Sequence, residues 1–153
     1  MSSDPNSRAR ANVEMITAAF AAFAERGPDS ASGMMDPEVE VVSKQSPNAG
    51  TFHGIPGYKR WSDRWFDAWE EFEIRVELIE PVGERHVVVS GRQHARGVKS
   101  GIAVDMKASY MIEIGPDGLA TRFHLYSSRD EALAEARRGE AEEPEGPARS
   151  SSA

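Results

Sequence analysis

A tyrosine, a histidine and a glutamate are the residues of this sequence whose chemistry could act on a small molecule. Tyr110 lies in the middle of the apolar segment IAVDMKASYMIEI, and a buried tyrosine hydroxyl requires a hydrogen-bond partner. We interpret it either as a donor to a ligand carbonyl or developing oxyanion, or as a core residue whose hydroxyl reaches water. His53, in the loop segment QSPNAGTFHGIPG, and Glu40, in MDPEVEVVS, are the candidate proton carriers. Glu40 qualifies only if a one-residue slip or bulge turns it inward.

Composition and spacing exclude several other kinds of chemistry. The sequence has no cysteine, so it can form no disulfide, thiol nucleophile or thiolate metal site. Its four histidines are not paired at a metal-binding spacing, and no Gly-x-Ser-x-Gly nucleophile elbow occurs. We therefore expect neither a metal nor another cofactor.

The basic stretch SGRQHARGVKSG, residues 90–101, has the glycines and cations of a phosphate-binding loop. Such a loop runs into a helix, whereas this stretch runs into a segment that alternates with period two and is therefore a strand. Arg92, His94 and Arg96 fall on the outer face of the preceding strand. Gln93 falls on the inner face, where it could orient a ligand or close the rim of the core.

Composition indicates one globular domain. The chain has 153 residues, of which 39% are hydrophobic, enough for a single core. The net charge of −7 argues against nucleic-acid binding, which needs a basic surface. No apolar segment has the length of a signal peptide or a membrane span, so we expect a cytoplasmic protein. We expect residues 1–9 to be flexible, residues 10–137 to form the domain, and the acidic, serine-rich residues 138–153 to be disordered.

Hydrophobic residues at helical spacing predict helices over residues 10–26 and 56–71, and a short one over 130–137. Gly27 and Pro28 end the first helix. The second helix carries an aromatic stripe of Tyr58, Trp61, Trp65 and Trp69. We interpret this stripe as partly core and partly pocket wall, with Trp65 in the pocket and Tyr58 near its mouth.

Period-two alternation predicts a sheet built from residues 35–43, 51–53, 72–80, 85–97, 102–114 and 119–127. If residues 115–118 form a four-residue turn, Tyr110 lies opposite Phe123 on the inner face and Ser109 lies opposite His124 on the outer face. We therefore expect an α+β fold, with helices covering one face of a curved antiparallel sheet. The outer face carries large side chains of mixed polarity, as a covered face or a dimer interface would: Met111, Arg122, His124 and Tyr126.

The order of these segments resembles a known superfamily. FHGIPG opens the second helix, and IGPDGLATRFHLY is followed by RDEAL. Over residues 10–137 the chain looks like the SnoaL-like, or polyketide cyclase-like, branch of the nuclear transport factor 2-like proteins. The resemblance implies a cone-shaped sheet wrapped around helices, a pocket for a small apolar ligand at its open end, and a homodimer through the outer sheet face. The pocket residues that we expect are Gln93, Trp65, Tyr58, Met106, Phe123 and Val41.

The resemblance does not imply one reaction, because proteins of this fold include isomerases, cyclases, hydrolases, dehydratases and plain binding proteins. Ketosteroid isomerase chemistry needs an aspartate base, a tyrosine and a protonated aspartate. The corresponding positions fall near Val41, Phe20 and Tyr110, and the first two are apolar. Two hypotheses remain: an acid/base enzyme acting on an apolar carbonyl compound, or a non-catalytic ligand-binding or accessory protein. An Asp, Glu or His within reach of the Tyr110 hydroxyl would distinguish them.

Overall fold

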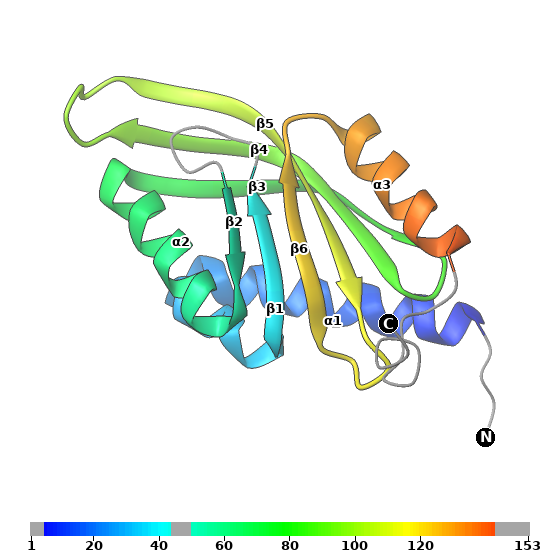
Figure 1. Ribbon diagram of the computed structural model, residues 1–153. Helices are drawn as coiled ribbons and strands as arrows, with labels where there is room; N and C mark the ends of the chain where they lie inside the picture. Colours follow the sequence, from blue (N-terminus) through cyan, green and yellow to red (C-terminus); the bar gives the residue numbers. More distant parts are fainter. Residues whose placement is uncertain (1–4, 44–49, 143–153) are drawn as a thin grey trace.

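A computed structural model describes residues 5–43 and 50–142 (Figure 1). Three α-helices, a 3₁₀ segment and six strands follow along these residues in the order α1 (Pro5–Arg26), η1 (Pro28–Met34), β1 (Met35–Ser43), β2 (Gly50–His53), α2 (Gly54–Ala68), β3 (Trp69–Val82), β4 (His86–Gly97), β5 (Ala103–Ile114), β6 (Ala120–Tyr126) and α3 (Arg129–Ala141). This is the α+β arrangement that the sequence predicts.

The strands form one curved sheet in the order β2-β1-β6-β5-β4-β3 (Figure 1). β1 pairs antiparallel with β2, and β3, β4, β5 and β6 pair antiparallel in sequence, whereas β1 and β6 pair parallel. The sheet is therefore mixed, whereas the sequence predicts a wholly antiparallel sheet. Alternation within a strand shows which residues share a face, but it does not show the direction of pairing between strands that are distant in the sequence.

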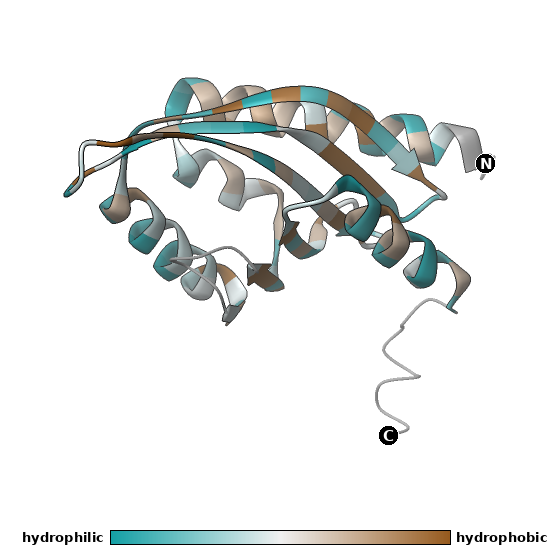
Figure 2. Ribbon diagram, turned by 90° about the horizontal axis from the view of Figure 1, so that it is seen from above, coloured by the Kyte–Doolittle hydropathy of each residue, from teal (hydrophilic) through white to brown (hydrophobic). Residues whose placement is uncertain are grey.

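The two faces of the sheet are covered by different helices. Alternate residues of the strands, such as Val87, Val89 and Ile112, join the main core together with residues of α1 and α2. The opposite face carries Val88 and Met111 into a second core beneath α3. Figure 2 shows that the strands hold most of the hydrophobic stretches, whereas α3 is largely hydrophilic on its outer side.

The faces of β5 and β6 are as predicted, but their register is shifted by two residues. Tyr110 pairs with Leu125 and Ile112 pairs with Phe123, while Ser109 faces Tyr126 and not His124. The cause is the connection between the strands, which is longer than a four-residue turn and follows an irregularity after Glu113. Because the shift is even, every side chain keeps its face.

The helices differ from prediction at their ends. The first begins at Pro5, a residue suited to an initial turn. Residues 5–9, which we expect to be flexible, are therefore helical, and residues 1–4 lie outside the described part. The second ends at Ala68, because Trp69 adopts an extended conformation and already begins β3. The third reaches Ala141, so only residues 143–153 of the expected disordered tail lie outside the description. Its Ser128 side chain accepts a hydrogen bond from the Glu131 amide, as at a capped helix start.

Two irregularities bend β3. One extra residue lies between Glu70 and Glu73 relative to β4, and another lies between Val76 and Leu78. The second irregularity turns Leu78 outward, where it is 43% exposed, although simple alternation places it with Ile74. A bulge of this kind adds a residue to one strand and increases its bend, which curves the sheet around the helices.

Candidate functional site

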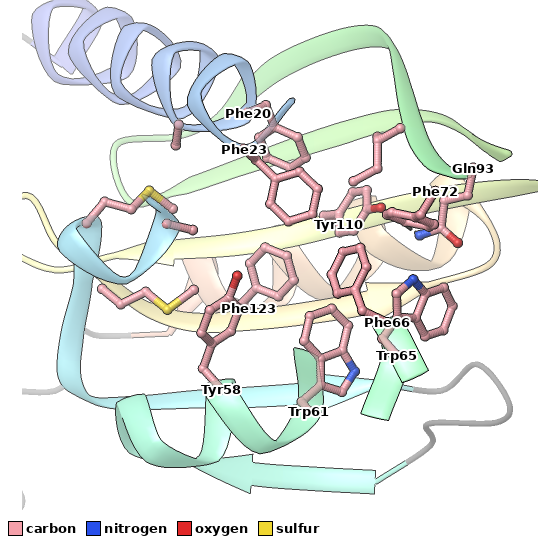
Figure 3. A pocket seen from close by; sticks show the side chains of 15 residues that line it. Phe20, Phe23, Tyr58, Trp61, Trp65, Phe66, Phe72, Gln93, Tyr110 and Phe123 are labelled. Atoms are coloured by element: carbon pink, nitrogen blue, oxygen red, sulfur yellow. Dashed lines mark hydrogen bonds between the residues drawn. The ribbon is translucent and has the colours of Figure 1, made fainter. Parts of the chain in front are cut away.

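An aromatic cavity lies between α1, α2 and the inner face of the sheet (Figure 3). The space inside it that is open to the centre of a water-sized sphere is about 40 Å³. The side chains that line it are almost all apolar: Ala19, Phe20, Phe23, Ala31, Met34, Met35, Tyr58, Trp61, Trp65, Phe66, Phe72, Ile74, Gln93, Tyr110 and Phe123. A volume of this size holds a few water molecules.

The aromatic wall contributed by α2 follows from its helical spacing. Tyr58, Trp61 and Trp65 recur every three or four residues, so they point from one face of the helix toward the sheet. Neighbouring rings along this series have centroids 5.9 and 6.1 Å apart. The Tyr58 hydroxyl donates to the Pro28 carbonyl at 2.9 Å, so this tyrosine holds α2 against the segment that follows α1.

Two polar side chains face one another within this apolar surrounding. The Gln93 amide nitrogen of β4 donates to the Tyr110 hydroxyl of β5 at 2.7 Å, and both residues are only 2% exposed. Phe20 from α1 and Phe123 from β6 pack against the Tyr110 ring with centroids 5.4 and 5.5 Å away. The hydroxyl is therefore held in one place by the strands and the aromatic side chains around it.

Two residues that line the cavity carry buried polar atoms without a hydrogen-bond partner among the described residues. The Gln93 Oε1 acceptor and the Trp65 Nε1 donor are buried and find no partner within residues 5–43 and 50–142. A buried polar group without a partner costs about 1–3 kcal/mol. These groups therefore favour occupation of the cavity by water or by a ligand with polar atoms.

Burial controls the protonation of the Tyr110 hydroxyl. Removal from water raises its pKa well above 10.0, and the Gln93 hydrogen bond opposes that shift only in part. The phenol thus stays neutral near pH 7 and serves as a hydrogen-bonding group but not as a base. Among the described residues, no Asp, Glu, His, Lys or Arg side chain lines the cavity.

The predicted site residues fall into two groups. Tyr110, Gln93, Trp65, Tyr58 and Phe123 line the cavity. The others do not: Val41 is buried in the main core, Met106 lies half-buried opposite Gln93, and His53 is exposed at the start of α2.

Four phenylalanines of the cavity were not predicted as site residues: Phe20, Phe23, Phe66 and Phe72. Helical spacing places Phe20 and Phe23 on the inner face of α1, and period two places Phe72 on the face of Ile74. These patterns indicate an inward position but do not distinguish a cavity wall from the core. Phe66 lies beside the aromatic stripe of α2 and gave no separate signal.

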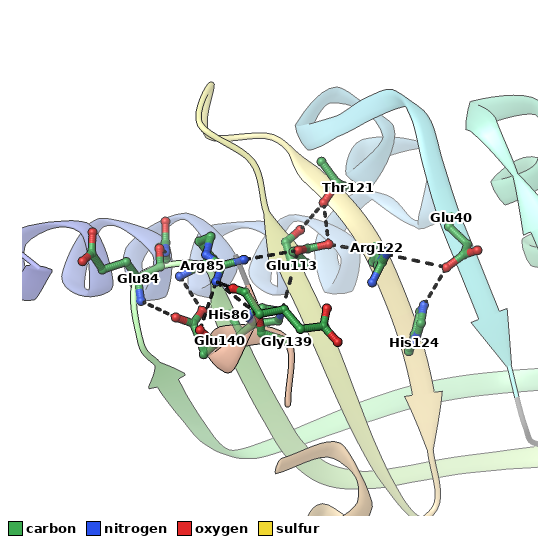
Figure 4. Close-up of polar contacts among 12 residues, drawn as sticks. Glu40, Glu84, Arg85, His86, Glu113, Thr121, Arg122, His124, Gly139 and Glu140 are labelled. Carbon is green, nitrogen blue, oxygen red and sulfur yellow. Dashed lines mark hydrogen bonds and ion pairs between the residues drawn. The ribbon is translucent and has the colours of Figure 1, made fainter. Parts of the chain in front are cut away.

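Glu40 lies on the outer face of the sheet, where no slip or bulge turns it inward. Its carboxylate is 3.1 Å from the His124 Nε2 and 3.9 Å from the Arg122 Nε (Figure 4). Arg122 in turn is 3.4 Å from Glu113. The charged side chains of three neighbouring strands thus neutralise one another on the face opposite the cavity.

The expected dimer face is partly covered by the chain itself. Met111 and Tyr126 are 2% and 5% exposed because α3 packs on them, which corrects their assignment to a subunit interface. Of the four residues expected there, Arg122 and His124 are not part of the core beneath α3, and their side chains are 46% and 12% exposed. A homodimer through this face stays a prediction.

The end of α3 is fixed to the sheet by a partly buried polar cluster (Figure 4). The Glu140 carboxylate accepts from the Arg85 backbone amide at 2.9 Å and lies 2.6 Å from the His86 Nδ1. Arg85 donates to the Gly139 and Glu142 carbonyls at 3.1 and 3.0 Å, satisfying groups that a helix end leaves free. His86 therefore has a structural role in seating α3.

Within residues 5–43 and 50–142, no three His, Asp or Glu side chains gather closely enough to hold a metal ion. No helix among these residues combines the length and the apolar character needed to cross a membrane.

A bent, unclosed sheet that encloses a pocket against two helices defines a cone-shaped α+β protein of the nuclear transport factor 2-like class. The SnoaL-like domain matches residues 16–123, which is more than half of the sequence. The chain belongs to this family. No curated protein matches the sequence.

Solved structures of the same fold agree with this assignment. TerC co-crystallized with polyporic acid is 23% identical, with a TM-score of 0.68 over 84% of this chain and 98% of that one. An NTF2-like protein of unknown function from Burkholderia pseudomallei is 19% identical, with a TM-score of 0.69 over 81% and 95%. A ketosteroid isomerase-like protein from Catenulispora acidiphila, in complex with trimethylamine, is 16% identical, with a TM-score of 0.64 over 80% and 92%. At these identities the likeness shows the fold alone.

Proposed function

We propose that the protein binds a small, uncharged, mostly aromatic molecule in the cavity and performs no acid/base chemistry on it. The observation that carries this proposal is the Gln93–Tyr110 pair: a buried, partly unsatisfied polar pair in a wall that contains no titratable carboxylate or imidazole among the described residues. A carbonyl or hydroxyl group of the ligand would complete its hydrogen bonds.

The absence of charge from the described cavity wall favours a neutral ligand. A carboxylate or ammonium group would lose its hydration without gaining a charged partner, at a cost of several kcal/mol. Aromatic rings of α1 and α2 would instead pack on a flat apolar ligand, with ring contacts worth about 0.5–1.5 kcal/mol each beyond the buried area.

An acid/base enzyme built on the same site would lack a proton carrier. The two candidates for that role, Glu40 and His53, do not line the cavity, and Glu40 is engaged with His124 on the outer face. The raised pKa of Tyr110 keeps its proton in place. Of the two hypotheses, the structure thus favours the binding protein.

Proteins of the same fold have been crystallised with small organic molecules, polyporic acid in TerC and trimethylamine in the Catenulispora acidiphila protein. These ligands belong to those proteins. They support only the proposal that a protein of this fold can bind a small organic molecule.

Naphthol and naphthalene, which differ by one hydroxyl group, test the proposal. We expect wild type to bind naphthol about threefold to tenfold more tightly than naphthalene, the effect of one added hydrogen bond. Gln93→Leu should abolish that preference while retaining the aromatic contacts. Calorimetric titration would measure both affinities, with Leu78→Ala as an exposed control on β3.

If wild type bound neither naphthol nor naphthalene, the proposal would be overturned. A preference for naphthol that persists in Gln93→Leu would show that another group forms the hydrogen bond with the naphthol hydroxyl.

A further inference from the structure

A groove on the surface adjoins the cavity and shares part of its wall. Its free space on the same water-sphere measure is about 340 Å³, compared with about 40 Å³ in the cavity. It is bordered by the end of α1, the end of α2 and β3. Five residues line both spaces: Phe20, Phe23, Phe66, Phe72 and Ile74.

Three of these shared residues form a closed group of rings. The centroids of Phe66 and Phe72 are 5.3 Å apart, those of Phe23 and Phe66 are 6.0 Å apart, and those of Phe23 and Phe72 are 6.4 Å apart. The three rings come from α1, α2 and β3 and lie between the helices and the strand (Figure 3). Each is half-buried, so each has one side toward the core and another toward the surface.

The backbone before Phe72 is unusual. Glu71 has a φ of 55° and lies in the bulge between Glu70 and Glu73, a conformation that is uncommon for a residue with a side chain. The extra residue allows Trp69 and Phe72, three apart, both to face the inner side. Such bulges re-aim side chains beside binding sites.

We propose that the groove and the cavity are two compartments of one ligand site, separated by a gate of Phe23, Phe66 and Phe72. This inference rests on the proposed function. The ligand is then an elongated, uncharged compound of at least two aromatic rings, with its hydroxyl or carbonyl end at the Gln93–Tyr110 pair and its other end in the groove.

Size and charge support this ligand class. About 10–15 Å³ of such space holds one water molecule, so the cavity in its present form takes the polar end of a ligand but not the whole length of a compound such as para-phenylphenol. Within the described residues, the single charged side chain that borders the groove is Glu73, which is 3.6 Å from Arg75. The rest of the groove is apolar and suits an uncharged ring.

Phenol and para-phenylphenol, which differ by one further ring, test the two-compartment site. We expect wild type to bind para-phenylphenol at least about tenfold more tightly, because the second ring is buried in the groove. Stopped-flow tryptophan fluorescence would follow binding, since Trp65 lines the cavity.

The gate predicts an effect on association. If the gate is open about a tenth of the time, Phe72→Ala should raise the association rate constant of para-phenylphenol about tenfold. Phe72→Trp, which adds bulk without removing the ring, should lower it. Rings that only form a wall would change mainly the dissociation rate. Leu78→Ala, on the same strand but outside both compartments, is the matched control.

The outcomes separate this inference from the proposed function. If wild type binds none of the phenols and naphthols, the proposed function fails and the gate with it. If naphthol binds in a Gln93-dependent way, but para-phenylphenol binds no better than phenol and both Phe72 variants associate at the wild-type rate, the two-compartment site alone is overturned. Thermal unfolding of each variant confirms that it is folded.

Discussion

The two faces of the sheet differ in chemistry although they are built from the same strands. On β5, Tyr110 and Ile112 point into an aromatic interior, whereas Glu113 points to a network of Arg85, His86 and Arg122. Alternation along a strand makes this separation possible. The aromatic cavity and the charged side chains of these strands therefore lie on opposite sides of one sheet.

The separation leaves the described cavity wall without a carboxylate or imidazole that could carry a proton. A carboxylate beside the aromatic wall would pay a desolvation cost of several kcal/mol unless it were paired. On the outer face, Glu40 and Glu113 keep water and cationic neighbours. Glu40, the carboxylate that the sequence offers as a proton carrier, therefore points away from the cavity.

Ile112 and Glu113 are adjacent residues on opposite faces and provide the largest expected contrast. Ile112 is fully buried, so Ile112→Ala should lower the free energy of unfolding by about 2–5 kcal/mol. Glu113→Gln removes partly exposed ion pairs of 3.4 to 3.9 Å and should cost about 1 kcal/mol or less. Urea denaturation measures both, and equal losses would contradict the division of roles between the faces.

Burial of Tyr110 predicts a smaller effect that depends on pH. Below the ordinary tyrosine pKa of 10.0, the phenol is neutral in both the folded and the unfolded chain. Above it, the unfolded chain ionises first, because burial raises the pKa in the folded state. The free energy of unfolding should then fall by up to about 1.4 kcal/mol per pH unit for this residue.

Tyr110→Phe removes this contribution and isolates it from the other groups that titrate at high pH. Denaturation of wild type and variant over a pH series on both sides of 10.0 should show a shallower decline for the variant. Tyr58 and Tyr126, whose pKa values are also raised mainly by burial, leave a decline in both proteins. Parallel curves would mean that the Tyr110 hydroxyl reaches water in the folded state.

Much of this arrangement could be predicted from the sequence, because it depends on local periods. The faces of β5, the inward Gln93 and the aromatic face of α2 follow from spacings of two or of three to four residues. The register of β5 and β6, the parallel pairing of β1 with β6 and the turning of Leu78 depend on loop length and bulges, which alternation does not reveal. The packing of α3 on the outer face could not be predicted either, because the sequence of this helix does not show which surface it covers. In the structure it covers Met111.

The smallest expected effect is the most direct test of the separation between the faces. Glu40 contacts His124 and Arg122 on the outer face and does not line the cavity. Glu40→Gln keeps the shape of the side chain and removes only its charge, so naphthol affinity should stay within about twofold of wild type, less than one hydrogen bond contributes. A Gln93→Leu sample in the same titration shows the change that a cavity residue produces. If Glu40→Gln weakened binding as much as Gln93→Leu does, the charge on the outer face would act through the sheet on the ligand, and the two faces could not be treated as independent.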